Sequence, residues 1–515
     1  MSYGISPHDQ EKGHHYHHND HVDQEKPTTE FVEHADASSS SRRDSSILQT
    51  PSDPNGKLTR KLLWKLDLRI LPMLALLFLF SFLDRTSIGN AKVLGLNADL
   101  GLSSGQYANS LAIFFAFYIA SEVPSNLVMK RVSPRWWLAG LTTVWGVIAM
   151  SLGFVRNYTD LMVVRAFLGV AEGGLLPGIV LYLSMCYKRS EMALRLGLIY
   201  SSASLSGAFG GLLATGLNRL GGSGHLPETS IPLKGWRWLF IVEGLMTVAV
   251  GLLAALVLPP SLDKAKFLTP EERILVVDRL QRDKPQGSAD VDAFSWFQVR
   301  RAVFTIQTWL SASAYFCLLT ALYSFGLFVP TIIKGLGYSA IDAQLFSVPP
   351  YAVAAVLTVI AAFVSDRYRI RGPVMLAFIP LSIIGYAVIR TTDHNKVKYG
   401  ALFLMASGLY PAVPPVLVWL SNNSAPHYKR ATAVGLQLAI ANCGGFPATF
   451  IYPAEQGPAF VEGHTIVLGL LCASWVLVAA NCAYCRYQNA QKRAGHMEKF
   501  RGCGDDRDPD FIYII

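Results

Sequence analysis

The sequence predicts an all-α membrane protein whose twelve transmembrane helices form two pseudo-symmetric six-helix bundles. Hydrophobic residues make up 51% of the 515 residues and charged residues only 16%, a balance too apolar for a protein with a wetted surface. Apolar stretches of about 20 residues, the length that crosses a bilayer as a helix, recur along the chain. Lys and Arg are concentrated in alternate links between these stretches, as orientation signals are.

Residues 1–56 precede the first apolar stretch. They are rich in His, Ser, Asp and Glu and show almost no apolar periodicity, so we expect a disordered cytoplasmic tail. The cluster from His14 to His18 suggests metal binding, but a polar run without convergent ligands is more often simply solvated. We therefore predict no metal site and no cofactor. The seven cysteines follow no secreted framework, so no structural disulfide is expected.

Two groups of six apolar stretches follow the tail. The predicted N-terminal bundle, residues 57–258, contains stretches at about 62–83, 106–128, 137–155, 160–187, 196–217 and 236–258. The predicted C-terminal bundle, residues 303–487, contains stretches at about 303–329, 345–364, 373–391, 399–421, 432–452 and 465–486. A cytoplasmic C-terminal tail, residues 488–515, completes the chain. Three prolines in the tenth stretch predict an interruption there: Pro411, Pro414 and Pro415.

A charged cytoplasmic linker, residues 259–302, separates the two bundles. Thr269, Pro270 and Glu272 form a capping-box pattern, which predicts a short surface helix. A second, amphipathic segment begins at Phe294, and we expect it to lie at the membrane interface. Neither segment requires a catalytic role.

The links between the stretches indicate the orientation of the chain in the membrane. Links after even-numbered stretches carry more Lys and Arg than the opposite links. The contrast is weakest at the opposite link 392–398, which contains Lys396 and Lys398. Because positively charged links stay in the cytoplasm, we expect both termini there. The membrane we expect is the plasma membrane, as part of the uptake hypothesis below. The net charge of +9 arises from these links, so we expect no nucleic-acid partner.

Four charged residues inside apolar stretches mark the candidate functional site. Arg165 and Glu172 lie seven residues apart in the fourth stretch, so both side chains leave one helix face, about 10 Å apart. Asp84 and Arg85 end the apolar run of the first stretch. Charges at membrane depth are costly and usually face a cavity or a partner charge, which favours a transport pathway. Since the two stretches enter from opposite sides, we expect the four charges to converge.

Four segments narrow the class of protein. They read FLDRTSIGNA at 82–91, EVPSNLVMKRVSPR at 122–135, RAFLGVAEGGLLPG at 165–178 and GWRWLFIVEGL at 235–245. Together they resemble the anion:cation symporter family of the major facilitator superfamily, in its fungal allantoate and nicotinate permease branch. The resemblance extends over about residues 60–490 and implies the major facilitator fold. One departure is Lys130, where the superfamily signature usually has an acid, whereas Asp366 and Arg367 retain the signature in the second half.

The resemblance also implies roles for the four charges. Asp84 and Glu172 match acids implicated in proton coupling. Arg85 and Arg165 match arginines associated with anion recognition or charge pairing. The alternative is that the four residues form static ion pairs that hold the first and fourth spans together.

Other polar residues in the spans have weaker assignments. Tyr118 matches a pocket-facing position and Asn442 a polar position that could bond substrate, so both are predicted to bind substrate. The alternatives are helix packing for Tyr118 and hydrogen bonding between spans for Asn442. For Glu122 and Glu243 we favour helix pairing or gating over a direct role.

The leading hypothesis is a transporter that takes up a small organic anion, such as nicotinate or allantoate, together with protons by alternating access. Its expected partners are the anion, protons and the lipid bilayer, and we expect a monomer. Two alternatives are an exporter of a carboxylated secondary metabolite and a membrane nutrient sensor that does not transport. An enzyme is not favoured, because no nucleophile, metal-ligand set or cofactor motif converges on any span.

Overall fold

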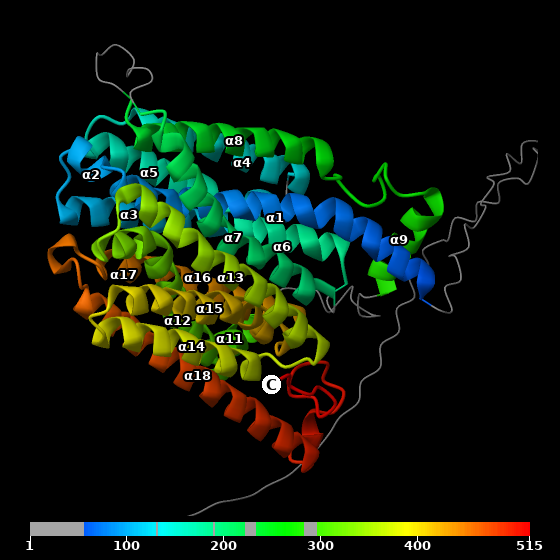
Figure 1. Ribbon diagram of the computed structural model, residues 1–515. Coiled ribbons are helices and arrows are strands. Elements are labelled where there is room, and N and C mark those ends of the chain that lie inside the picture. The colour runs from blue at the N-terminus through cyan, green and yellow to red at the C-terminus, as the bar shows by residue number, and fades with distance from the viewer. Residues whose placement is uncertain (1–55, 130–131, 189–190, 222–232, 283–295) are drawn as a thin grey trace, which may run out of the picture. The chain divides into compact units, whose positions relative to one another are not determined.

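The computed structural model describes residues 56–129, 132–188, 191–221, 233–282 and 296–515 (Figure 1). Several sequence features lie outside the described residues. These are the predicted tail with its histidine cluster at His14 to His18, Lys130, and the part of the central linker that includes Phe294.

Helices account for most of the described residues. The first half contains α1 (Lys57–Val93), α2 (Leu96–Asp99), α3 (Ser104–Met129), α4 (Pro134–Ser151), α5 (Tyr158–Glu172), α6 (Leu175–Cys186), α7 (Met192–Asn218) and α8 (Gly235–Val257). The second half contains α12 (Ile306–Gly335), α13 (Ala340–Arg367), α14 (Gly372–Thr391), α15 (Asn395–Asn422), α16 (His427–Cys443), α17 (Gly445–Phe450) and α18 (Val461–Arg493). Helices α9 (Pro270–Arg282) and α11 (Trp296–Phe304) lie between the halves.

The helices account for all twelve predicted spans. Ten helical stretches in the described residues are long and apolar enough to cross a membrane. Helix α3 is a further span whose apolar character is reduced by polar residues such as Gln106 and Glu122. The pair α16 and α17 makes the remaining span, which is broken at Gly444 so that neither piece is long enough alone. The predicted all-helical membrane fold is therefore confirmed.

Glycines allow α5 to pack closely against α3. A Cβ atom at Gly169 would lie 2.3 Å from the carbonyl oxygen of Phe114, and one at Gly173 would lie 2.4 Å from that of Tyr118. The helix breaks just after Glu172, and α6 begins at Leu175. The fourth span, made of α5 and α6, therefore packs closely on α3 and bends after Glu172.

Two details of the predicted spans are wrong. Helix α1 does not end near Leu83 but continues through Asp84 and Arg85 to Val93, because both charged side chains are buried among partners within the protein. Helix α15 is not interrupted at its prolines. It runs unbroken through the segment from Pro411 to Pro415, where neighbouring helices bury almost every side chain.

The two linker helices agree with the sequence patterns. The Thr269 hydroxyl accepts from the Glu272 amide at 3.3 Å, and the Glu272 carboxylate accepts from the Thr269 amide at 3.0 Å, which completes the capping box. Glu272 also accepts a bond of 2.8 Å from Lys65 at the start of α1. Helix α11 exposes Trp296 and Phe304, as expected of a helix at the membrane interface.

Helices of the two halves pack against one another along their length. Within the first half α4 packs on α8, α3 on α5, and α1 on α7 and α8, while in the second half α14 packs on α15 and α12 on α18. Between the halves α1 contacts α12, α7 contacts α13, and α3 contacts α16 and α17. We call the ends of the helices where α1 begins the first face, and the opposite ends the second face. Figure 1 shows α9 at the first face and α2 and α17 at the second.

Backbone contacts close the two halves together near the second face. A Cβ atom at Gly89 in α1 would lie 2.2 Å from the carbonyl oxygen of Leu327 in α12. A Cβ atom at Gly211 in α7 would lie 2.5 Å from the carbonyl oxygen of Gln344 in α13. The Gln344 amide also donates to the Asn90 carbonyl at 3.3 Å. These approaches are possible only because glycine lacks a side chain.

The segment after α18 folds back onto the first face of the second half. Asp506 accepts from Lys429 in α16 at 2.5 Å and from Arg301 in α11 at 2.9 Å. The carbonyl oxygen of Ile514 accepts from Asn423 at the end of α15 at 2.7 Å. The segment thereby links helices that are distant in the sequence.

Replacement of Gly89 by Ala should favour the conformation that is open at the second face, because the added methyl group cannot fit against the Leu327 carbonyl. The test is thiol labelling from that side at a Thr86→Cys position, which lines a pocket between α1 and α12. The seven native cysteines are replaced beforehand. Labelling should rise several-fold in the Gly89→Ala variant. Gly105→Ala is the control, since a Cβ atom at Gly105 would meet nothing within 4 Å. Equal labelling in all variants would show that this contact does not govern closure.

Replacement of Asp506 by Asn should destabilise the first face of the second half by about 3 kcal/mol, since Lys429 and Arg301 would lose a buried carboxylate partner. Thermal unfolding of the purified protein in detergent measures the effect. Asp510→Asn is the matched control, because its side chain is 77% exposed and should change little. An Asp506→Asn variant as stable as the parent would contradict the anchoring role of this segment.

Candidate functional site

The centre of the first half contains a buried ion pair between α1 and α5. The Nε atom of Arg85 donates to Glu172 Oε1 at 2.6 Å, and the Ser81 hydroxyl donates to the same oxygen. Arg85 is 6% exposed and Glu172 is fully buried. The sequence led us to expect contact between the charges of these two helices, and this pair supplies it. Removing either partner would leave the other charge buried and unpaired.

Three aromatic rings complete the surroundings of Arg85. Its guanidinium carbon lies 4.5 Å from the ring centre of Tyr118, 5.2 Å from that of Phe82 and 5.8 Å from that of Phe114. The negative faces of aromatic rings attract a cation where water is excluded. Tyr118, predicted to face the pocket and bind substrate, is not among the residues that line the pocket; its ring packs against the Arg85 guanidinium and stabilises the charge.

A chain of hydrogen bonds extends from this ion pair across the interface between the halves. Arg85 Nη1 donates to the Tyr323 hydroxyl in α12 at 3.2 Å. That hydroxyl donates to the Asn442 oxygen in α16 at 3.5 Å, and the Asn442 amide donates to Glu122 in α3 at 3.1 Å. The chain begins in the first half, passes through two helices of the second half and returns to the first. The halves cannot separate here without breaking it.

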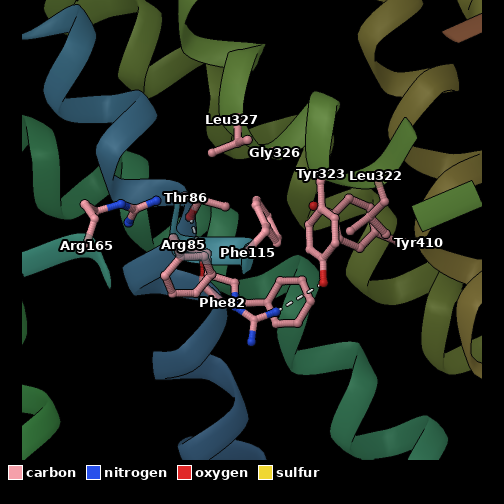
Figure 2. Close-up of a pocket in the computed structure, with 11 residues that line it drawn as sticks. Phe82, Arg85, Thr86, Phe115, Arg165, Leu322, Tyr323, Gly326, Leu327 and Tyr410 are labelled. Atoms are coloured by element: carbon pink, nitrogen blue, oxygen red, sulfur yellow. Dashed lines mark hydrogen bonds between the residues drawn. The ribbon is translucent and has the colours of Figure 1, made fainter. Parts of the chain in front are cut away.

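The pocket next to this chain lies between α1, α3, α5, α12 and α15 (Figure 2). Two of its lining residues are charged, and both are arginines. The others are mostly aromatic or apolar, and the lining consists of Phe82, Arg85, Thr86, Phe114, Phe115, Arg165, Leu322, Tyr323, Gly326, Leu327 and Tyr410. The free space between them is about that of a single water molecule. A substrate can therefore enter only if side chains or helices move apart.

The guanidinium of Arg165 has different partners from that of Arg85. Its Nε atom donates to the Ser110 carbonyl at 3.2 Å, and its guanidinium carbon lies 4.8 Å from the ring centre of Phe114. It is only 1% exposed, yet its Nη1 atom has no hydrogen-bond partner in the described part of the chain. Figure 2 shows Arg165 at the edge of the pocket, on the other side of Thr86 from Tyr323. A buried guanidinium with an unused donor is well suited to bind a carboxylate.

Asp84 bonds to helices other than α5. Its carboxylate accepts a hydrogen bond from Trp145 in α4 and one of 3.5 Å from Thr247 in α8. Consecutive residues of a helix point about 100° apart, so Arg85 faces α5 and the pocket while Asp84 faces α4 and α8. Asp84 thus makes no direct bond to the other three charged side chains, although it lies near enough to Glu172 and Arg165 to interact with them electrostatically. Among the described residues only Arg85 and Glu172 of the four form an ion pair with each other, and Arg165 forms none.

The predicted substrate-binding residue Asn442 lies between Tyr323 and Glu122 rather than among the residues that line the pocket. Two residues near the ion pair were not assigned to the site from the sequence. Ser81 could have been found, because it precedes Arg85 by one helical turn and so shares its face. Trp145 could not, since no local pattern indicates that α4 passes behind Asp84.

Sequence comparison identifies the class of protein to which this helical arrangement belongs. Residues 74–449 match the sequence model of the Major Facilitator Superfamily. The chain belongs to this superfamily. It is 36% identical over 464 residues to an uncharacterised transporter of Schizosaccharomyces pombe, covering 88% of this chain and 93% of that protein. It is 31% identical over 481 residues to the high-affinity nicotinic acid transporter of Saccharomyces cerevisiae, covering 92% of this chain and 87% of that protein.

Solved structures of major facilitator transporters share the fold. The xylose transporter XylE from E. coli, in a partially occluded inward open conformation, superimposes with a TM-score of 0.62 at 16% identity, over 82% of this chain and 98% of XylE. A bacterial homologue of the human lysosomal transporter Spinster gives a TM-score of 0.59 at 17% identity, over 81% of this chain and 96% of the homologue. The predicted superfamily and fold are confirmed, and this superfamily member is a multi-pass membrane transporter, not an enzyme.

Replacement of Arg85 and Glu172 by Gln, singly and together, tests the ion pair of the transporter. Each single variant should be less stable than the parent, because it leaves one buried charge without its partner. The double variant should be more stable than the sum of the single effects predicts, with an interaction energy of about 1 to 3 kcal/mol. Thermal unfolding of the purified variants measures this energy. Strictly additive effects would mean that the two charges stabilise the bundle independently.

Proposed function

We propose that this transporter carries a small organic anion together with protons by alternating access between its two halves. The observation that carries the proposal is Arg165, a buried cation at the edge of the central pocket with an unused Nη1 donor. A carboxylate in the pocket would supply the acceptor that Arg165 lacks. Charge-assisted bonds of this kind are about twice as strong as bonds between neutral groups.

The rest of the lining favours an anion that also has a flat, apolar portion. Besides the two arginines, five aromatic side chains line the pocket: Phe82, Phe114, Phe115, Tyr323 and Tyr410. Rings of this kind stack on a planar group. The similarity to a nicotinic acid transporter supports the same substrate class, so nicotinate is the first anion to test, followed by allantoate and related carboxylates.

Exchange of partners at Arg85 offers a route to proton coupling. The substrate carboxylate would compete with Glu172 for the Arg85 guanidinium. A buried Glu172 that loses its cation would be left ionised in a medium that solvates charge poorly, so it would take up a proton. Anion binding and proton binding would then favour one another. In this proposal Glu172 and Asp84 bind protons, while Arg85 and Arg165 bind the anion.

Alternating access in this proposal is a movement of the N-terminal bundle, residues 57–258, relative to the C-terminal bundle, residues 303–487. Opening toward either side would break the hydrogen bonds that Tyr323 and Asn442 make with the first half. The excess of Lys and Arg in alternate links supports an orientation with the first face in the cytoplasm. We place the protein in the plasma membrane, where protons that move inward with the anion would make transport an uptake.

Replacement of Arg165 by Gln should raise the KM for nicotinate by about 10-fold to 100-fold, the effect of losing a charge-assisted hydrogen bond. The measurement is uptake of radiolabelled nicotinate by cells that express the full chain, with and without a proton gradient. Arg165→Lys should be less affected than Arg165→Gln, because it keeps the charge but loses the second donor.

Arg156→Gln serves as the control, since Arg156 is an exposed arginine just before α5 and lies outside the pocket. Its KM should equal that of the parent, and the amount of each variant at the cell surface should be measured alongside. An Arg165→Gln variant with an unchanged KM for every carried anion would reduce Arg165 to a structural residue. Failure of the parent to accumulate any carboxylate would refute the proposed substrate class.

A further inference from the structure

A second cluster of acidic residues lies behind α1, on the side opposite to the pocket ion pair. Asp84 in α1 is 3% exposed and Glu243 in α8 is fully buried, and the two carboxyl groups lie within hydrogen-bonding reach of each other. The Ser87 hydroxyl donates to Glu243 Oε1 at 2.8 Å. The Glu243 Oε2 atom meets no N–H or O–H donor among the described residues.

In the described part of the chain, no cation forms an ion pair with Asp84 or Glu243. Arg165 lies within electrostatic range of Asp84 but does not bond to it. Arg85 is paired with Glu172 on another face of α1. Arg165 in α5 donates to a backbone carbonyl and faces the pocket, while Arg237 in α8 pairs with Asp99 at 3.2 Å and donates to two backbone carbonyls. In α4 and α7, the ionisable residues in the described parts lie near the first-face ends, away from the cluster.

Two carboxylates that touch each other and are cut off from water cannot both stay ionised. If one proton is placed between Asp84 and Glu243, one carboxyl group becomes a donor and the other remains an acceptor. The proton thereby supplies the donor that Glu243 Oε2 lacks. The orphaned oxygen and the close approach of the acids thus have a single chemical explanation.

We propose that Asp84 and Glu243 form a proton-binding pair that holds one shared proton in this conformation, separate from the anion pocket. The proposal assigns to Glu243 a role in binding the transported proton and rests on the proton-coupled function proposed above. No covalent step is involved: the proton arrives from water on one side of the membrane, is held between the carboxyl groups, and leaves to water on the other side.

The packing of the helices explains how this pair could respond to the anion. Helices α4 and α8 approach at glycines, since a Cβ atom at Gly146 would lie 2.7 Å from the Val248 amide nitrogen and one at Gly244 would lie 2.6 Å from the Gly146 carbonyl oxygen. The two helices therefore move as one body. Helix α1 carries Arg85 toward the pocket and Asp84 toward this body. A shift of α1 on anion binding would alter the contact between Asp84 and Glu243 and so its affinity for the proton.

Replacement of Glu243 by Gln tests the pair in the full chain, reconstituted in lipid vesicles with nicotinate as the probe. Two rates are compared: accumulation driven by a proton gradient, and exchange of labelled for unlabelled nicotinate without a gradient. The ratio of accumulation to exchange should fall by about 10-fold in the Glu243→Gln variant, because exchange does not require net proton movement. The dependence of accumulation on pH should flatten in parallel.

Thr142→Val is the matched control, since Thr142 is a fully buried polar residue of α4 that bonds only a carbonyl of its own helix. Its ratio of accumulation to exchange should equal that of the parent. A Glu243→Gln variant that keeps the parental ratio and the parental pH dependence would overturn the proposal.

Infrared difference spectroscopy of the purified full-length protein provides a test that does not depend on transport. The parent should show the C=O stretch of a protonated carboxyl group at neutral pH, and Glu243→Gln and Asp84→Asn should each remove or shift it. A parent without any such band would overturn the proposal even if the variants do not fold. If the parent transports no carboxylate but shows the band, the proposed function fails while the protonated pair stands.

Discussion

The ion pair between Arg85 and Glu172 is the interaction on which the rest of the site depends. Neither group can be solvated at this depth, so each requires the other, and the pair ties α1 to α5. The surrounding side chains stabilise both charges further: Ser81 donates to the carboxylate, and three aromatic rings face the guanidinium. In the proposed function this pair is also exchangeable: a substrate carboxylate would take the place of Glu172 at Arg85, so a costly structural feature would serve transport.

The remaining donors of Arg85 extend the effect of the pair to the other half of the molecule. Through Tyr323 and Asn442 the guanidinium is linked to Glu122, so the polar groups at the interface between the halves form one connected chain. In an apolar interior, breaking one hydrogen bond leaves its donor and acceptor without partners, and each then costs its full desolvation free energy. For the halves to separate, these hydrogen bonds must all break, or bonds to substrate or water must replace them. Close backbone contact at Gly89 adds a geometric constraint to this electrostatic one.

Helix α1 connects two chemically different regions. Arg85 faces a pocket whose charged lining consists of two arginines, whereas Asp84 faces a second acid, Glu243. Because the two residues are adjacent in a rigid helix, neither can move without the other. In the proposed function, this adjacency would link the binding of an anion in the pocket to the binding of a proton between Asp84 and Glu243.

The sequence by itself determined the class of fold, the twelve spans and the identity of the buried charges, since these follow from the energetic cost of placing polar groups in lipid and are visible in local composition. It also predicted the capping box of the linker helix, which depends on a few adjacent residues. Only the tertiary structure decided which charges meet. Whether Asp84 joins Arg85 or turns toward Trp145 depends on how α4 and α8 pack behind α1, and no spacing along the chain encodes that. The continuity of α15 across its prolines was likewise decided by the helices packed around it. Burial on all sides compensates for the backbone hydrogen bonds that proline, which lacks an N–H group, cannot make.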